Sequence, residues 1–231
     1  MFDAIVERPT PFPRGRHVFR AGTPFTSLYV VRSGVVATRT AQDRPAIARV
    51  TNFYLPGEIF GFVGICESQY QNDAIVLERA TLCEIPFDAL QTLSASLPAV
   101  QQRLAQLMSR MVAHQELFHN AITGGTAIER VALFVLDLAR RRGKAGLSSS
   151  DLRIPLSRKE MGNFLGLALE TVSRTLARLT EEQLITASRR HIRILDRTGL
   201  ARLAGCEEAM TTGLNGRQMT SGGRAEGTSC A

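Results

Sequence analysis

Residues 157–179 read SRKEMGNFLGLALETVSRTLARL and carry the strongest structural signal in the chain. Ser157 precedes Glu160 by three positions, which is the pattern of a capping box: the serine oxygen accepts the backbone N–H of Glu160, and the glutamate reaches back. An apolar stripe and a glycine follow, at Met161, Phe164, Leu165 and Gly166. The pattern predicts a short helix that ends in a tight turn.

A second helix is expected from about Leu169 to Glu182. Its buried face has apolar residues at spacings of four and three, namely Val172, Leu176 and Leu179. Its other face is polar or small, with Glu170, Ser173, Arg174, Ala177 and Arg178. A short helix, a glycine turn and a second helix predict a helix-turn-helix motif over about residues 158–177.

A basic hairpin is expected after this motif. The apolar stretches 184–185 and 192–195 flank Ser-Arg-Arg-His at residues 188–191. Short apolar runs that flank a polar tip are typical of two antiparallel strands. The hairpin would form a wing beside the helix-turn-helix.

The chemistry of the second helix fits DNA recognition. The N-terminal part of such a helix reaches base edges in the major groove. Arg174 can donate two bonds to guanine, Glu170 can accept from a cytosine amine, and Ser173 can do either. Phosphate contacts are expected from Arg158, Lys159, Thr171, Arg178, Arg189 and Arg190. A plain i, i+4 surface ion pair between Glu170 and Arg174 is the alternative for those two residues.

Net charge is distributed unevenly along the 231 residues. The formal charge is +7, of which +6 falls in residues 124–231. A basic module joined to a nearly neutral one favours a polyanion binder coupled to a second function, although a solvated arginine-rich surface would look the same.

Several other protein classes are disfavoured by the sequence. It contains no apolar run of membrane-spanning length, and its first residues lack the apolar core of a signal peptide. The four cysteines lie far apart, at Cys66, Cys83, Cys206 and Cys230, so we expect neither a disulfide framework nor a zinc site. No nucleophile elbow or phosphate-cradling glycine loop is present, so we expect no enzyme. A cytoplasmic protein without a membrane partner is the expectation.

The N-terminal part predicts an antiparallel β-structure. Residues 12–95 consist of short apolar runs that are separated by turn formers at 8–12-residue intervals, as in barrels and sandwiches. Turns are expected at Ser33-Gly34 and a loop over residues 55–61, with strands that include 47–53, 73–78 and 80–85. One or two helical turns are expected over Phe87–Leu93.

A long helix is expected over residues 97–122. Its narrow apolar seam has near-heptad spacing, through Val100, Leu104, Leu107, Met111 and Phe118. The seam favours a homodimer helix, and packing on the barrel of its own chain is the alternative. A further amphipathic helix is expected over residues 126–142.

The predicted fold class is α+β, with four segments. Residues 1–95 would form an antiparallel β-roll, 96–123 the dimerisation helix and 124–199 a winged helix-turn-helix. Residues 200–231 would form a mostly disordered tail, because Gly, Thr and Ser dominate its end without periodicity.

The segment 154–176 resembles the DNA-binding motif of the Crp/Fnr transcription regulators, in particular the Fnr branch with its Anr-like and FixK-like members. Phe2–Arg8, Arg32-Ser-Gly and the stretch 83–90 are also similar to that branch. The resemblance implies a dimer that controls anaerobic or microaerobic genes together with RNA polymerase, as an activator or as a repressor. It also implies that Glu170, Ser173 and Arg174 read a TTGAT-type half-site.

The resemblance leaves the signal open. Where cyclic-nucleotide binders of the superfamily carry a glutamate, an arginine and a hydroxyl, this chain has Phe62, Asn72 and Asp73, so cyclic nucleotide binding is not expected. Fnr proteins with a [4Fe–4S] cluster use four cysteines, of which only Cys83 matches here. The chain is therefore expected to be cluster-free, with Cys83 a core residue, unless a longer product carries the other ligands. A regulator with haem, nitric oxide or a metabolite in the barrel is the alternative.

Overall fold

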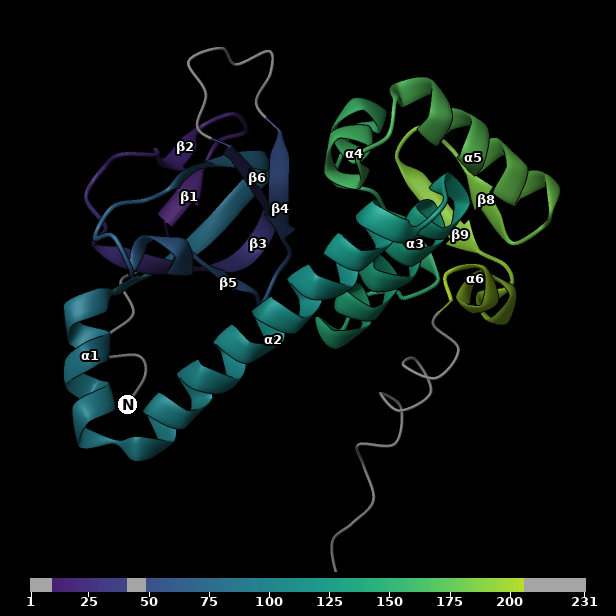
Figure 1. Cartoon of the computed structure of the whole chain (residues 1–231). Helices are drawn as coiled ribbons and strands as arrows, with labels where there is room; N and C mark the ends of the chain where they lie inside the picture. Colours follow the sequence, from purple (N-terminus) through teal and green to yellow (C-terminus); the bar gives the residue numbers. More distant parts are fainter. Residues whose placement is uncertain (1–9, 41–48, 206–231) are drawn as a thin grey trace, which may run out of the picture.

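Two long antiparallel strands organise the N-terminal lobe of the computed structural model, which describes residues 10–40 and 49–205 (Figure 1). β3 spans Ser27–Thr40 and β6 spans Asn72–Pro86. They pair along their whole length, with Ser27 opposite Pro86 and Thr40 opposite Asn72. The antiparallel roll predicted from the sequence is therefore confirmed.

The predicted turn at Ser33-Gly34 is wrong, because β3 continues through it. Register shifts between Val31 and Val36 mark bulges in the pairing with β6. Gly34 has a φ of 80°, and a Cβ at this position would overlap the carbonyl oxygen of Arg79. A bulge of this kind bends a strand without ending it. The glycine serves the bend, and the chain on both sides of it belongs to one strand. The strands predicted over 73–78 and 80–85 are likewise parts of one strand, β6.

Four shorter strands complete the roll. They are β1 (Thr10–Phe12), β2 (His17–Phe19), β4 (Val50–Tyr54) and β5 (Ile59–Phe60). The order is β1-β6-β3-β4, with β2 paired to β6 and β5 paired to β3. The predicted loop 55–61 thus contains a strand, and the start of the strand predicted from 47 lies outside the described residues. Stacked aromatic rings fill the interior of the roll, from Phe19, Tyr29, Tyr54, Phe60 and Tyr70.

Two helices lead out of the roll. A 3-10 turn, η2, spans Phe62–Gly64 before β6. After β6, α1 spans Phe87–Ser96, so it is longer than the one or two turns predicted. α2 spans Pro98–Gly124, with proline in its first turn, as expected of the long helix. Figure 1 shows α2 running from below the roll to the C-terminal lobe.

The C-terminal lobe is a winged helix-turn-helix built on α3 (Ala127–Lys144), which Thr126 and Glu129 cap at its start. The other elements are β7 (Asp151–Arg153), α4 (Arg158–Leu165), α5 (Leu169–Glu181), β8 (Ile185–Ala187), β9 (His191–Ile194) and α6 (Arg197–Leu203). The expectation that residues from 200 onward are disordered is wrong for α6, since Asp196 caps it and Leu200 is buried. Residues 206–231 lie outside the described part.

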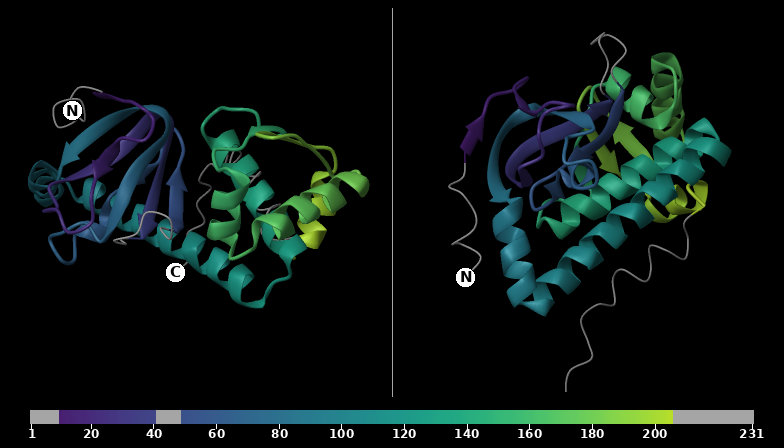
Figure 2. Two further views of the ribbon diagram at one scale, coloured as in Figure 1. Left: turned by 90° about the horizontal axis from the view of Figure 1, so that it is seen from above. Right: turned by 60° about the vertical axis from the view of Figure 1, so that its left-hand side comes forward.

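One of the apolar core clusters extends across both lobes, which lie side by side along α2 (Figure 2). The Phe53 ring in β4 lies 5.9 Å from Phe134 and 5.6 Å from Phe164 in the other lobe. Next to this contact, Arg39 in β3 forms a 2.7 Å ion pair with Glu160 in α4. Among the described residues, no helix combines the length and the apolar character that crossing a membrane requires.

Candidate nucleic-acid interface

The helix-turn-helix forms because its turn is locally specified. The predicted capping box is confirmed: the backbone N–H of Glu160 donates to Ser157 Oγ at 3.2 Å, and Ser157 N donates to Glu160 Oε2 at 2.8 Å. Gly166 ends α4 with a φ of 65°, a conformation that favours glycine. A Cβ on Gly162 would lie 2.5 Å from the Leu167 carbonyl oxygen. These residues fix the angle at which α5 leaves α4.

α5 is buried on one face and exposed on the other, as the sequence predicts. Its buried face consists of Val172, Thr175, Leu176 and Leu179. Glu170, Ser173 and Arg174 are all exposed on its first turns. The Ser173 hydroxyl donates back to the Leu169 carbonyl at 3.0 Å. Within the described residues, neither Glu170 nor Arg174 forms a salt bridge; the ion pair on α5 joins Arg178 and Glu182 instead. The structure therefore does not contain the alternative ion pair between Glu170 and Arg174.

The predicted wing is present beside α5. β9 pairs with β8, and it also pairs with β7, a strand that the sequence did not reveal. Ser188 N donates to the His191 carbonyl at 2.8 Å and closes the hairpin, which leaves Arg189 exposed at its tip. Arg158 donates to the Ser188 carbonyl at 2.8 Å. This bond ties the wing to the start of α4, and burial lowers the pKa of Arg158.

The remaining candidates for phosphate contact differ in their surroundings. Lys159 is exposed, and Thr171 is half-buried. Arg178 pairs with Glu182 at 2.8 Å, and Arg190 lies 3.9 Å from Glu78 of the roll. Lys159 and Arg189 are therefore the cations of this set for which the described residues provide no partner.

The apolar seam predicted on α2 lies partly within its own chain. Val100 packs with Leu28 and Leu90, and the Phe118 ring lies 5.2 Å from Phe164. Both side chains are buried: Val100 packs on the roll, as in the alternative of packing on its own barrel, whereas Phe118 packs against α4 of the C-terminal lobe. Leu104, Leu107 and Met111 are half-buried. Another side of α2 exposes Met108 (42%) and Val112 (54%).

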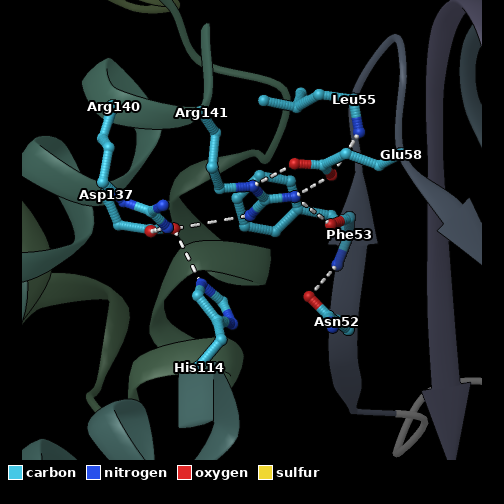
Figure 3. Close-up of polar contacts among 8 residues, drawn as sticks. All are labelled: Asn52, Phe53, Leu55, Glu58, His114, Asp137, Arg140 and Arg141. Carbon is cyan, nitrogen blue, oxygen red and sulfur yellow. Dashed lines mark hydrogen bonds and ion pairs between the residues drawn. The ribbon is translucent and has the colours of Figure 1, made fainter. Parts of the chain in front are cut away.

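A buried polar network at the junction of the lobes was not predicted. Arg141 in α3 donates through Nε to Glu58 Oε1 at 2.8 Å, and its other nitrogens bond Glu58 Oε2, the Phe53 carbonyl and Asp137 (Figure 3). Its guanidinium also lies over the Phe53 ring, 4.3 Å from the centroid. In the sequence, Arg141 is one of three arginines at a helix end, and nothing there indicates a partner 83 positions away.

Asp137 is the acidic centre of this network. His114 Nε2 lies 3.0 Å from its Oδ2, and Arg140 donates to Oδ1 at 2.6 Å. Burial by itself would raise the pKa of Asp137, but the hydrogen bond from His114 and the charges of Arg141 and Arg140 lower the pKa to about 2. The carboxylate is thus held ionised inside the protein.

Comparison with known proteins identifies the architecture. The Crp-like helix-turn-helix domain matches residues 129–203, and the cyclic nucleotide-binding domain matches residues 9–96. The chain is 39% identical over 203 residues to the transcriptional activator protein FnrA of Stutzerimonas stutzeri, an alignment that covers 88% of this chain and 83% of that protein. The chain belongs to the Crp/Fnr family of transcription regulators.

Other Crp/Fnr proteins match equally broadly. The transcriptional activator Anr of Pseudomonas aeruginosa is 39% identical with the same coverage. The solved structure of FixK2 from Bradyrhizobium japonicum superimposes with a TM-score of 0.74 at 25% identity, covering 85% of this chain and 98% of that one. These matches confirm the family and fold inferred from the sequence.

The barrel of this Crp/Fnr chain does not fit a cyclic nucleotide. Asp73, at the position of a phosphate-binding hydroxyl, accepts the backbone N–H of Ala21 at 2.9 Å and lies 3.9 Å from His17. A carboxylate there repels a phosphate. Phe19 and Tyr70 stack 3.7 Å apart in the interior, and Phe60 fills the space beside Tyr29.

The described residues also do not fit a four-thiolate cluster. They contain the buried Cys83 and the exposed Cys66, and no group of three or more His, Cys, Asp or Glu side chains among them is arranged to hold a metal ion. Cys83 lies in β6 opposite Val30, where it packs as a small apolar side chain.

Proposed function

We propose that this Crp/Fnr chain binds a palindromic DNA operator as a homodimer, with α5 of each protomer in the major groove of a half-site. One observation carries the proposal: Glu170, Ser173 and Arg174 are exposed together at the start of a helix whose opposite face is buried. Side chains at the start of a recognition helix reach base edges. Arg174 would donate to guanine O6 and N7, and Glu170 would accept from a cytosine amine.

The half-site we propose is of the TTGAT type. Glu170, Ser173 and Arg174 match the Glu-x-x-Ser-Arg pattern that reads this sequence in the Fnr branch. Lys159 is exposed in the first turn of α4, and Arg189 is exposed at the tip of the wing. These two side chains would contact phosphates on either side of α5. Phosphate contacts set the position of the helix but carry no base information. Arg158, Thr171, Arg178 and Arg190 are proposed as auxiliary phosphate contacts.

Dimerisation is proposed through the exposed side of α2. Met108 and Val112 are four positions apart on one helix face, and both are more exposed than the seam residues predicted from the sequence. An apolar row on a long helix is the usual surface for coiled-coil pairing. Leu104 would lie at the edge of this surface. The two α5 helices would then meet half-sites one helical turn apart.

The role proposed for the dimer is activation of anaerobic or microaerobic genes in the cytoplasm, together with RNA polymerase. Support comes from the relatives, which are named as transcriptional activators in Stutzerimonas stutzeri and Pseudomonas aeruginosa and as an anaerobic regulatory protein in Pasteurella multocida.

The test is a binding titration that uses fluorescence anisotropy with the full chain at about 0.15 M ionic strength. A duplex with two inverted TTGAT half-sites is compared with a scrambled duplex of equal composition. We expect the palindrome to bind about 1,000-fold more tightly or better, the range of specific regulators. Equal affinity for the two duplexes would refute the proposal.

A further inference from the structure

A cavity of about 340 Å³ lies outside the barrel, where the roll, α2 and α3 meet. The loop between β4 and β5 forms one wall with Glu58, α2 forms the second with Leu107 and Met111, and α3 forms the third with Arg140. A ligand in this cavity would contact the roll, the long helix and the first helix of the DNA-binding lobe at once. The cavity borders the polar network around Arg141 and Asp137 that Figure 3 shows.

The cavity has an excess of positive charge. Arg103, Arg110 and Lys144 line it, and none of the three forms a salt bridge with a carboxylate of the described residues. The one acidic side chain in the lining is Glu58, and Arg141 engages both of its oxygens. The negative charge of Glu58 is therefore neutralised by Arg141 and does not offset the other cations of the cavity.

The cations also act on one another. Burial lowers the pKa of Lys144, and the charges of Arg140 and Arg110 lower it further. Like charges held this close raise the free energy of the empty cavity, and a bound anion would relieve the repulsion. Asp137 and Glu58 act in the opposite direction on Lys144, but more weakly.

The remaining lining indicates the kind of anion. Guanidinium groups bind phosphate oxygens through paired hydrogen bonds, and an ammonium group adds a point charge. Tyr54, Ile59 and Leu107 form apolar walls next to the cations. Such a mixture suits a phosphate group that is attached to an apolar or aromatic body.

We propose that this cavity binds a small phosphate-bearing ligand, with its phosphate on Arg110 and Lys144, and that its occupation changes the affinity of the protein for DNA. The second part of this proposal, the regulatory half, is the effect of the ligand on DNA affinity, and it rests on the proposed function. Ligand binding itself can be measured without DNA, so the two proposals can fail separately.

The binding test is isothermal titration calorimetry on the full chain at about 0.15 M ionic strength. Pyrophosphate probes the phosphate group alone, and ATP probes a phosphate on an aromatic body. We expect saturable binding of at least one of them, with one site per chain. If both bind equally, the phosphate determines affinity, and tighter binding of ATP assigns a contribution to the apolar walls. No saturable binding of either probe would overturn the proposal.

Variants assign the binding to this cavity. In Arg110→Gln/Lys144→Gln, affinity for the probe should fall about tenfold or more, because the loss of even one of the two charge-assisted contacts would cost about that much. Arg14→Gln/Arg32→Gln removes the same charge from exposed positions of the roll and should leave the affinity unchanged. None of the four residues lies in an apolar core, and equal thermal midpoints will verify that the variants fold. Equal losses in both variants would overturn the cavity assignment.

A third variant excludes the DNA-binding surface as the site. If Arg174→Gln/Arg189→Gln abolishes probe binding, the probe lies on that surface and the proposal is wrong. The regulatory half is tested by anisotropy: saturating probe should change the affinity for DNA about threefold or more in the parent chain, and not in Arg110→Gln/Lys144→Gln. An unchanged affinity would refute the regulatory half alone. If DNA binding itself is absent while the probe still binds, the proposed function fails and the site stands.

Discussion

Arg174 provides the residue-scale test of base recognition. It is exposed on the first turns of α5 and forms no salt bridge within the described residues. Arg174→Ala should weaken binding to the TTGAT palindrome by about 1–3 kcal/mol and relax discrimination at one base pair. Arg178→Ala is the matched control, since loss of a phosphate contact weakens all sequences about equally. A base preference that persists unchanged in Arg174→Ala would contradict the assignment.

Asp137 provides a test of the interlobe network through pH. Its folded pKa of about 2 lies below the ordinary value of 3.8. A lowered pKa stabilises the folded state above the unfolded-state value, and this contribution is lost as pH falls from about 4 toward 2. Asp137→Asn should therefore lower the free energy of unfolding by roughly 2 kcal/mol or more near pH 7, with the gap narrowing below about pH 4. Urea unfolding of both proteins from pH 7 to pH 3 measures the difference in their free energies of unfolding. A difference that does not change with pH would contradict a contribution from the lowered pKa of Asp137.

At the scale of elements, α2 allows the dimer surface to be located. Met108→Glu/Val112→Glu places charge on its exposed apolar row, so we expect monomers in sedimentation velocity and loss of tight operator binding. Gln102→Glu/Gln106→Glu adds the same charge at other exposed positions of the helix and should remain dimeric. Persistence of the dimer in the first variant would place the interface elsewhere.

Elements that depend on neighbours in sequence were predicted well. The capping box, the turn at Gly166 and the buried face of α5 all arise within residues 157–179, so the sequence alone specifies them. A turn was predicted within β3 because Gly34 has the same sequence signature in a bulge as in a turn, and only the approach of Arg79 from β6 distinguishes them. The apolar seam of α2 combines two kinds of position, because Val100 and Phe118 are buried within their own chain while Leu104, Leu107 and Met111 are half-buried, and the heptad spacing alone does not distinguish them.

At the scale of the whole molecule, the shared core predicts cooperative unfolding. Phe53→Ala should cost about 3–5 kcal/mol and separate the lobes, because it removes the contacts with Phe134 and Phe164. All three tyrosines lie in the roll and the chain has no tryptophan, so tyrosine fluorescence reports the roll, whereas far-UV dichroism reports mainly the helices.

The two signals separate coupling from simple destabilisation. We expect coincident urea transitions in the parent chain and separate ones in Phe53→Ala. Phe19→Ala removes a buried ring that contacts only the roll, so it should lower stability while the transitions still coincide. Coincident transitions in Phe53→Ala would mean that the Phe53 contacts are not needed, and that the remaining apolar contacts and ion pairs between the lobes keep them coupled.

Glu160 forms two contacts that together limit how the roll can move relative to α4. One carboxylate oxygen holds the first turn of α4, while the other accepts from Arg39 of the roll. When the roll shifts relative to α4, either the Arg39 contact breaks or the start of the helix is pulled from its cap. The start of α4 is thus tied to a residue of the other lobe, and any displacement of the roll relative to α4 would be transmitted to the helix-turn-helix through the contact between Arg39 and Glu160.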